Sequence, residues 1–390
     1  MSDIDALIEK TNGPDSIAEQ AVGELIKIGM PVIEPVINAI RHGFPGATWR
    51  LCIILREIKD SQIIPVLLEL INDENSDLAI AAFLGLSQID DAKVIEQLQE
   101  YLVDSDKPPT RRALSAEALG NIGKTVAIDT LNSVAAALIS EPDVSPAFSN
   151  DGAGSDLYVD EDMIIVLIKS IVALAKMGKH DFINSIILLS KYSSEDPYSE
   201  DEVIRSMAVD SMQYTVGLGV VDSLMKSIQD EYYEVREKAI EAMFYIGTKE
   251  CICELVKRLE KEDSVLADNI LVRVSDLTGL PFQELQGISN LYEWWSSIEK
   301  EYESGICYRL GKPINLEDVI ILLEIPHKRE QVIKELRLIT GESFGLNEYE
   351  SLDRQNILFM NAKTWWTKNC DVYKNGCLYK YGYEQDLKNL

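Results

Sequence analysis

Residues 230–247 read DEYYEVREKAIEAMFYIG. An acidic turn leads into Val235-Arg236, and Gly247 closes the stretch. Between them apolar side chains recur at helical spacing, at Ala239, Met243 and Ile246. Residues separated by three, four and seven positions share one face of a helix, so the stretch predicts a helix with one apolar face.

The same pattern returns along the chain. The last apolar residue of each copy serves as a marker, and the markers are Ile28, Ile58, Ile89, Ile122, Met177, Val216, Ile246 and Leu277. Successive markers are separated by 30, 31, 33, 55, 39, 30 and 31 residues. The residues three positions before the first seven markers are apolar except Gln213, and those seven positions before are mostly small. A second apolar-periodic run follows each of these markers, so the unit is a pair of helices.

A two-helix unit cannot bury its apolar face alone, whereas stacked neighbours bury a continuous core. No strand-like alternation is sustained in the sequence. We therefore expect an all-α fold, an α-solenoid (superhelix) of about eight two-helix repeats that ends in a C-terminal helical cap.

At this point the sequence resembles the HEAT-repeat family, in the short bacterial form called phycobilin-lyase-like HEAT repeats. Residues Asp230, Val235-Arg236, Ala239, Ala242-Met243 and Ile246-Gly247 match the family pattern, and residues 104–123 repeat it more loosely. The resemblance covers roughly residues 16–280 and implies the solenoid fold, while this scaffold hosts many roles. It also implies that the Val-Arg helix lines the concave side and that Arg236 pairs with a carboxylate of a neighbouring turn.

An insertion at 140–162 explains the 55-residue step. It contains seven acidic residues, no Lys or Arg, and several Pro, Gly and Ser residues, which favours an exposed loop. The loop could also contact a protein, or Asp151, Asp156 and Asp160 could hold calcium. Their spacing does not follow the twelve-residue EF-hand pattern.

The expected domains are a solenoid at 1–265 and a C-terminal repeat or cap region at 266–390. In the second region, LVRVSDLTGLPF leads to Trp294-Trp295, and KELRLITGESFG leads to Trp365-Trp366. Large aromatic residues can seal the open end of a solenoid, so we interpret these segments as a cap; a ligand-binding aromatic box is the alternative. The Tyr-rich tail predicts a short hairpin around Asn375-Gly376.

The formal net charge is -28. Residues 300–390 hold 14 acidic and 13 basic side chains, so nearly all of this charge belongs to residues 1–299. Such a field repels nucleic acid and attracts basic partners, although solubility alone could explain it. No apolar run spans a bilayer, no secretory signal is visible, and the six scattered cysteines fit a reducing cytoplasm.

Catalytic signatures are missing. The three histidines do not form a metal-ligand pattern, the His-Glu pairs of iron-dependent HEAT hydroxylases are absent, and the cysteines lack paired zinc knuckles. We expect no cofactor, no metal and no enzyme. A bilin lyase activity rests on the scaffold resemblance alone.

The leading hypothesis is a protein-binding scaffold or adaptor with a basic partner. A narrower alternative is an immunity or inhibitor protein that neutralises a basic toxin such as a nuclease. The exposed concave stripe is expected at positions one and five before each marker. The candidate binding residues are Glu57, Glu117, Lys176, Glu241 and Tyr245, together with Asp151, Asp156 and Asp160 of the insertion.

Overall fold

The computed structural model describes residues 3–42, 48–58, 61–148, 160–193, 201–214, 219–262, 264–342 and 352–385. Contacts divide the chain into two compact units. Unit 1 comprises Met1–Ala137, Ile165–Met177 and Leu346–Asn356, and unit 2 comprises Leu138–Ile164, Gly178–Gly345 and Ile357–Leu390. This grouping does not test a domain boundary at residue 265.

Helices dominate the described residues, which confirms the all-α solenoid class. The helices that end near the markers, here the even helices, are α2 (Asp15–Ile28), α4 (Thr48–Glu57), α6 (Ser76–Leu86), α8 (Pro109–Ile122), α10 (Glu161–Lys176), α12 (Asp201–Ser211), α14 (Tyr233–Ile246) and α16 (Ser264–Thr278). The odd helices are α1 (Asp3–Lys10), α3 (Ile33–Arg41), α5 (Ile64–Leu70), α7 (Ala92–Val103), α9 (Ile128–Ser140), α11 (Ile183–Leu189), α13 (Val220–Ser227) and α15 (Lys249–Arg258).

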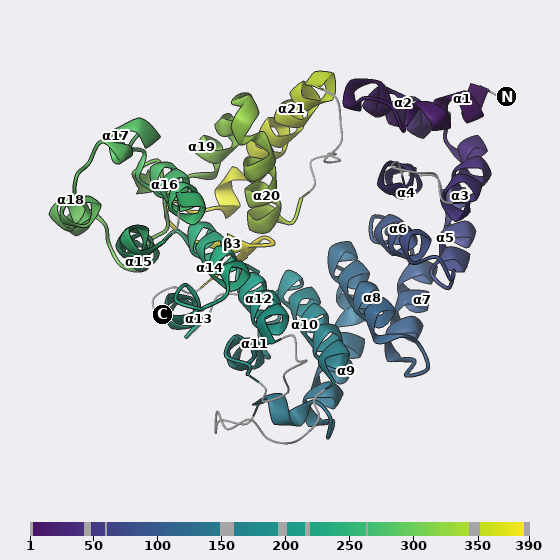
Figure 1. The fold of residues 1–390 in the computed structure, drawn as a ribbon, viewed down its shortest axis with the longest axis horizontal. Coiled ribbons are helices and arrows are strands. Elements are labelled where there is room, and N and C mark those ends of the chain that lie inside the picture. The colour runs from purple at the N-terminus through teal and green to yellow at the C-terminus, as the bar shows by residue number, and fades with distance from the viewer. Residues whose placement is uncertain are drawn as a thin grey trace. The chain divides into compact units, whose positions relative to one another are not determined.

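Most even helices pack against the odd helix that precedes them, and within each unit successive even helices of a row pack side by side. In unit 1 the even row runs α2, α4, α6, α8, and Figure 1 shows these helices in chain order. In unit 2 the row runs α12, α14, α16. The residues three and seven positions before the first seven markers are all buried, so the core columns expected from the sequence are confirmed.

Helix ends follow local sequence signals. The Asn75 side chain accepts hydrogen bonds from the backbone N–H groups of Asp77 and Leu78 at the start of α6. At the end of α14, Gly247 adopts a left-handed conformation (φ 65°), which a residue with a side chain adopts only with strain. Most marker residues therefore lie within one or two residues of a helix end; Val216 lies outside the described residues.

The C-terminal part of unit 2 contains two copies of one module. The first consists of α16, α17 (Phe282–Gln286), α18 (Leu291–Ile298) and a hairpin of β1 (Tyr308–Arg309) and β2 (Lys312–Pro313). After α19 (Leu316–Ile321), the second consists of α20 (Arg329–Thr340), α21 (Leu352–Asn369) and a hairpin of β3 (Tyr379–Lys380) and β4 (Tyr383–Glu384).

Each hairpin tip closes the C-terminal end of the helix that begins its module. The N–H groups of Leu310 and Gly311 donate to the carbonyls of Asp276 and Leu277, both at 2.9 Å. Tyr381 and Gly382 donate in the same way to Leu338 and Ile339, at 2.7 and 2.8 Å. These bonds satisfy carbonyls that a helix leaves unpaired at its end.

The hairpin expected around Asn375-Gly376 is wrong, because the second hairpin turns at Tyr381-Gly382 instead. The Gly376 N–H donates to Ile314, and its carbonyl accepts from Cys307. Residues 375–376 form a turn, in which the Cys377 N–H donates to the Lys374 carbonyl at 3.3 Å, but this turn contacts the first hairpin and does not join the paired strands β3 and β4.

The tryptophan pairs belong to aromatic rows within these modules. Trp295 is fully buried and lies beside Tyr302, which contacts Tyr308. In the second module Trp366 lies beside Tyr373, which contacts Tyr379. The rows hold the Trp helices to the hairpins, which supports packing rather than an open aromatic box.

Candidate protein-binding surface

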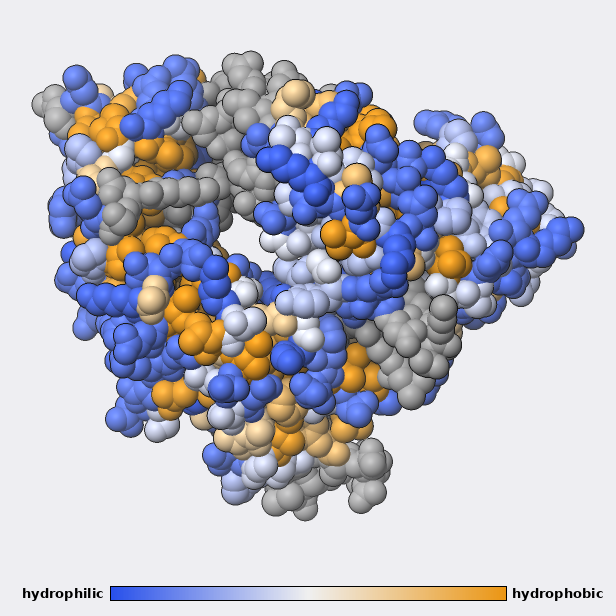
Figure 2. All heavy atoms as spheres, turned by 180° about the vertical axis from the view of Figure 1, so that it is seen from behind, coloured by the Kyte–Doolittle hydropathy of each residue, from blue (hydrophilic) through white to orange (hydrophobic). Residues whose placement is uncertain are grey.

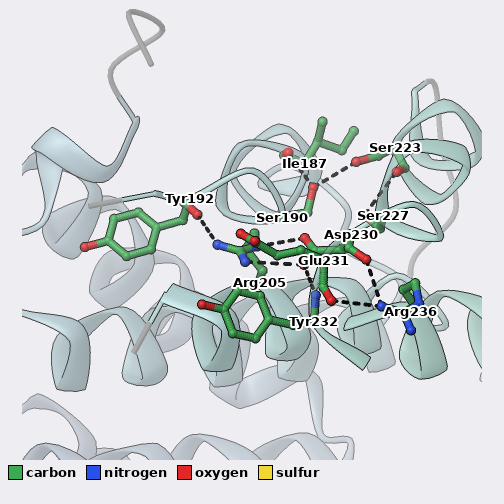
Figure 3. A network of polar contacts seen from close by, with 10 residues as sticks. All are labelled: Ile187, Ser190, Tyr192, Arg205, Ser223, Ser227, Asp230, Glu231, Tyr232 and Arg236. Atoms are coloured by element: carbon green, nitrogen blue, oxygen red, sulfur yellow. Dashed lines mark hydrogen bonds and ion pairs between the residues drawn. The ribbon is translucent and has the colours of Figure 1, made fainter. Parts of the chain in front are cut away.

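An arginine network links the turns that precede the even helices of unit 2 (Figure 3). The Arg205 guanidinium binds both carboxylate oxygens of Asp230, at 2.9 and 3.3 Å, and donates to the Tyr192 carbonyl at 2.9 Å. One repeat further on, Arg236 Nε lies 3.2 Å from the Glu262 carboxylate. The expectation that Arg236 pairs with a carboxylate of a neighbouring turn is confirmed.

The equivalent turns of unit 1 are connected by the same chemistry. Arg111 donates to the carbonyls of Ile71 and Asp73, and Arg41 forms an ion pair with Asp73 at 2.5 Å. Burial alone would raise the pKa of Asp73, but the hydrogen bond from Arg41 holds this pKa below its ordinary value. Asp73 therefore stays charged and joins successive turns.

These turns, each of which leads from an odd helix to the next even helix, form an edge rich in carboxylates. We call this edge the acidic edge of each unit. In unit 1 it includes the exposed residues Glu74, Asp77 and Asp106, and in unit 2 it includes Glu141, Asp143, Asp162, Glu231 and Glu234. Acidic residues at the first turn of a helix are favoured by the helix dipole. The arginines of this edge are bonded to backbone carbonyls and carboxylates, and the exposed acids outnumber the exposed lysines of these turns, which are Lys10, Lys191 and Lys261.

The opposite edge, formed by the even-to-odd turns, has mixed charge. Its described residues include Asp90, Asp91 and Asp181, but also Lys124, Lys179 and Lys249. Asp90 and Lys124 form an ion pair at 2.7 Å. Figure 2 shows that hydrophilic side chains cover most of one face of the molecule and that hydrophobic ones form separate patches. Among the described turns, exposed acids therefore outnumber exposed lysines more clearly on the acidic edge, where Lys10, Lys191 and Lys261 also lie, than on the opposite edge, while further exposed acids such as Glu34 and Glu96 lie on the odd helices.

The expected concave stripe is less exposed than the sequence suggests. Glu57 and Tyr245 are buried, at 5% and 4% exposure. Glu117 is half-buried and binds Lys169 at 2.8 Å, and Lys176 donates to the Asn121 side chain at 2.6 Å. The structure brings Glu117 and Lys176 onto neighbouring helices of unit 1, and Glu241 and Tyr245 onto one helix of unit 2.

Side chains at the start of α20 contact the stripe in unit 2. Lys334 binds the Glu241 carboxylate at 2.5 Å, and Lys328 and Gln331 bind Asp276 at 2.5 and 3.0 Å. Burial alone would raise the pKa of Glu241, but Lys334 lowers it. Glu241 and Tyr245 therefore serve an internal contact, which the repeat pattern does not indicate because α20 lies some ninety positions further along the chain.

Two buried cations hold the C-terminal modules to the end of α14. Arg309 donates to the Phe244 carbonyl at 2.9 Å and to Glu335 at 2.6 Å. Lys380, from the equivalent strand of the second hairpin, donates to the Tyr245 carbonyl at 3.3 Å. A cation at a helix C-terminus is favoured by the helix dipole, so both modules contribute one to the same helix end.

The insertion residues are only partly described. Asp151 and Asp156 lie outside the described residues. Asp160 accepts a hydrogen bond from the Met163 N–H at 3.1 Å, which is the geometry of a helix cap at the start of α10. This contact gives Asp160 a structural role.

Within the described ranges, no three His, Cys, Asp or Glu side chains are arranged to hold a metal ion. Burial raises the pKa of the Cys251 thiol to about 11 and that of Cys307 to about 12, so both thiols are protonated near neutral pH. In the part of the chain that is described, no helix has the length and apolar character to cross a membrane.

Comparison with known proteins identifies part of the chain. Residues 33–120 match the family model described as HEAT repeats, which confirms the resemblance over this stretch. No curated protein matches the chain.

Several solved structures are similar to the chain at low identity. One is the complex of CpcE and CpcF of phycocyanin lyase from Nostoc sp. PCC7120, with 12% identity, a TM-score of 0.36, and coverage of 77% of this chain and 95% of that chain. Another is human deoxyhypusine hydroxylase, with 13% identity, a TM-score of 0.24, and coverage of 76% and 94%. An engineered protein has 15% identity, a TM-score of 0.32, and coverage of 93% and 99%. At such TM-scores the similarities do not extend to function.

Proposed function

We propose that this protein is a non-enzymatic, protein-binding HEAT solenoid whose acidic edge receives a basic segment of a partner. The observation that carries the proposal is the charge asymmetry between the two edges of the helix rows. On one edge exposed carboxylates such as Glu74, Asp106 and Glu231 outnumber the exposed lysines, while on the other edge lysines and acids are more evenly matched.

The contacts within the edge explain why its charge faces outward. Arg205, Arg236 and Arg111 are bonded to turn carbonyls and carboxylates and hold successive turns together. The guanidinium groups are thus occupied by the turns themselves, and the field of the exposed acids extends into solvent. Complementary charge of this kind speeds association and makes it sensitive to salt.

A narrower version of the same proposal is an inhibitor of a basic toxin such as a nuclease. A nuclease binds phosphates with a positively charged cleft. The acidic edge of one unit can occupy such a cleft, whereas evenly scattered acids cannot. The edge asymmetry favours this version over general solubility as the reason for the charge.

The test uses two charge-matched variants of the whole chain. The edge variant carries Glu74→Lys, Asp106→Lys and Glu231→Lys. The control variant carries Glu34→Lys, Glu96→Lys and Asp222→Lys, which makes the same change of charge at exposed positions of odd helices. Partners are first captured from the source cells at low salt, and the binding of the purified partner is then measured for each variant.

We expect a basic partner that high salt releases. Its affinity should fall at least tenfold for the edge variant and change little for the control variant. A partner that resists high salt, or equal losses for both variants, would contradict binding through the acidic edge. A captured partner with nuclease activity that the chain inhibits would support the narrower version.

A further inference from the structure

Two cysteines, one from each C-terminal module, line the same cavity in unit 2. Cys307 directly precedes β1, and Cys377 lies two positions before β3. The cavity has a volume of about 20 Å³, and Arg309, Glu335 and Tyr379 form other parts of its wall. A space of this size can hold a water molecule but no organic ligand. The two thiols therefore share one small space rather than a ligand pocket.

A backbone hydrogen bond holds the two cysteines close together. The Cys307 N–H donates at 3.0 Å to the Gly376 carbonyl, which belongs to the peptide bond that joins Gly376 to Cys377. The Gly376 N–H donates in turn to the Ile314 carbonyl at 2.9 Å. These bonds keep the Cα atoms of Cys307 and Cys377 within the roughly 7 Å that a disulfide can bridge.

Tight packing supports the same approach. A Cβ atom at Gly376 would be 3.1 Å from the Ile306 Cγ2 atom and 3.3 Å from the Pro313 Cβ atom. The glycine therefore lies directly against residues from both sides of the first hairpin. Because Cys377 is the next residue, this packing brings Cys377 to Cys307.

The electrostatics of Cys307 agree with this placement. Burial raises the pKa of Cys307 to about 12, although Arg309 and Lys380 act to lower it and Cys251 and Cys377 act to raise it. Such an influence falls with distance, so the Cys377 sulfur lies in the surroundings of the Cys307 sulfur.

The two thiols differ in their access to solvent. Cys307 is 1% exposed, whereas Cys377 is only half-buried. A dissolved reagent therefore reaches Cys377 first, and Cys307 is placed to react afterwards with whatever Cys377 has bound.

We propose that Cys307 and Cys377 form a reversible disulfide that fastens the two C-terminal modules together when the surrounding thiol–disulfide balance becomes oxidising. Disulfides that form transiently in a reducing compartment are typical of redox sensing. The proposal concerns unit 2 alone and does not rest on binding through the acidic edge.

The oxidant is a small disulfide such as oxidised glutathione. The Cys377 thiol loses its proton, its sulfur attacks one sulfur of the oxidant, and the first glutathione leaves as a thiol. Cys307 then loses its proton, its sulfur attacks the Cys377 sulfur of the mixed disulfide, and the second glutathione leaves. Two protein thiols are thus oxidised to one disulfide, while the oxidant is reduced to two thiols.

Lys380 is placed to help the second step. Burial lowers its pKa to about 7, and Cys307 is the charged neighbour with the largest influence on it. At about pH 8 most of the Lys380 amine is uncharged, so it can accept the proton that Cys307 must lose.

The test exposes the whole reduced chain to oxidised glutathione at about pH 8. Unreacted thiols are then blocked with iodoacetamide, and mass spectrometry of the digested chain locates each disulfide. The variants are Cys377→Ser and Cys307→Ala. The control is Cys370→Ser, because Cys370 is an exposed cysteine close to Cys377 in sequence and thus its strongest competitor.

We expect one dominant disulfide, between Cys307 and Cys377, that dithiothreitol reverses. Cys370→Ser should form it to the same extent as the wild-type chain. Cys307→Ala should stop at the mixed disulfide of Cys377 with glutathione, and Cys377→Ser should leave Cys307 as a thiol. If Cys307→Ala fails to fold, Cys377→Ser at its half-buried position still provides the comparison.

Urea unfolding adds a measurement on the folded protein. Oxidation should raise the unfolding midpoint of the wild-type chain and of Cys370→Ser, because a link between residues about seventy positions apart restricts the unfolded chain. It should leave the midpoint of Cys377→Ser unchanged.

Three results would overturn the proposal. One is a folded chain in which neither cysteine reacts, or in which glutathione stays on Cys377 without giving way to an internal disulfide. Another is a link between Cys370 and Cys377 in place of the expected one. The third is a link between Cys307 and Cys377 that forms only after urea has unfolded the chain.

Discussion

Gly120 of α8 lies directly against Ala173 of α10. A Cβ atom at residue 120 would be only 2.7 Å from the Ala173 Cα atom and 2.8 Å from its Cβ atom. Both residues belong to unit 1, and this close approach sets the spacing at which Glu117 meets Lys169. The absence of a side chain at residue 120 is therefore a packing requirement of the helix row.

Gly120→Ala should destabilise the protein by about 1–3 kcal/mol, because the added methyl meets backbone atoms and forces the helices apart. Gly23→Ala in α2 is the matched control, since a methyl group at residue 23 would have no described atom within 4 Å. This second change should stabilise the helix by about 0.5–1 kcal/mol. Urea unfolding measures both. Equal effects of the two substitutions would show that the close approach has no energetic importance.

The arginine network at the acidic edge predicts a second stability effect. Arg205 and Asp230 are mostly buried, with side-chain exposures of 10% and 14%, and the guanidinium also binds the Tyr192 carbonyl. Arg205→Met should cost about 3 kcal/mol, because it removes the guanidinium from a mostly buried carboxylate, which keeps only the Tyr232 N–H at 3.0 Å, and removes a donor to the Tyr192 carbonyl. Arg205→Lys keeps the charge but loses the forked geometry and should cost less.

The control for this prediction is Lys124→Met. Lys124 and Asp90 are 47% and 66% exposed, and a surface pair of this kind contributes at most about 1 kcal/mol. Urea unfolding of the three variants should rank Arg205→Met as the least stable. If Lys124→Met were as destabilising as Arg205→Met, the network would not be a stabilising feature of the turns.

The sequence predicts the solenoid because its core residues are periodic. Leu25, Leu55 and Leu86 lie three positions before their markers, and each is fully buried in the structure. A local period of this kind needs no information about distant residues. The partner of Arg236 was also predictable, because the next turn of a solenoid is always about one repeat further along.

The exposure of the candidate binding residues was not predictable in the same way. Tyr245 and Glu241 follow the pattern of a solvent-facing stripe, but Lys334 and Lys380 come from far along the chain to contact them. The fold of this region depends on non-local pairing between modules, and periodicity contains no signal for it. The repeated Tyr-Arg-Leu-Gly and Tyr-Lys-Tyr-Gly sequences at 308–311 and 379–382 were the available clue to the two hairpins.

The two hairpin tips offer a matched pair of glycines for a third prediction. Gly311 and Gly382 both have positive φ, of 74° and 83°. A Cβ at Gly311 would be 2.5 Å from the Thr278 carbonyl oxygen, whereas one at Gly382 would be 3.7 Å from the Thr340 carbonyl oxygen. Alanine at either position incurs the left-handed strain of about 1 kcal/mol, but Gly311→Ala adds a backbone clash.

We therefore expect Gly311→Ala to be more destabilising than Gly382→Ala by about 1 kcal/mol or more. Thermal unfolding of the two variants gives the comparison directly. Equal losses would mean that the first hairpin shifts away from α16 at little cost, and would argue against its role as the closure of that helix.

The buried lysine of the second hairpin predicts a pH dependence of stability. Lys380 is 1% exposed, and its burial lowers its pKa to about 7 from an ordinary value of 10.5. Between about pH 7 and pH 10 the unfolded chain binds a proton that the folded protein does not, so the free energy of unfolding contributed by this group rises with pH. Below pH 7 the lysine is charged in both states, and its burial costs stability without further change.

Lys380→Met removes the titrating group and keeps most of its apolar volume. The free energy of unfolding of the variant, relative to that of the wild-type protein, should be highest below pH 7. It should fall as the pH rises to 10, by at most about 1.4 kcal/mol for each pH unit. Urea unfolding at several pH values gives the difference, and Lys312→Met in the first hairpin corrects for the loss of one positive charge. A difference between wild type and Lys380→Met that stays constant across this range would show that Lys380 does not titrate there, and that the contact with the Tyr245 carbonyl is made by a charged ammonium group throughout.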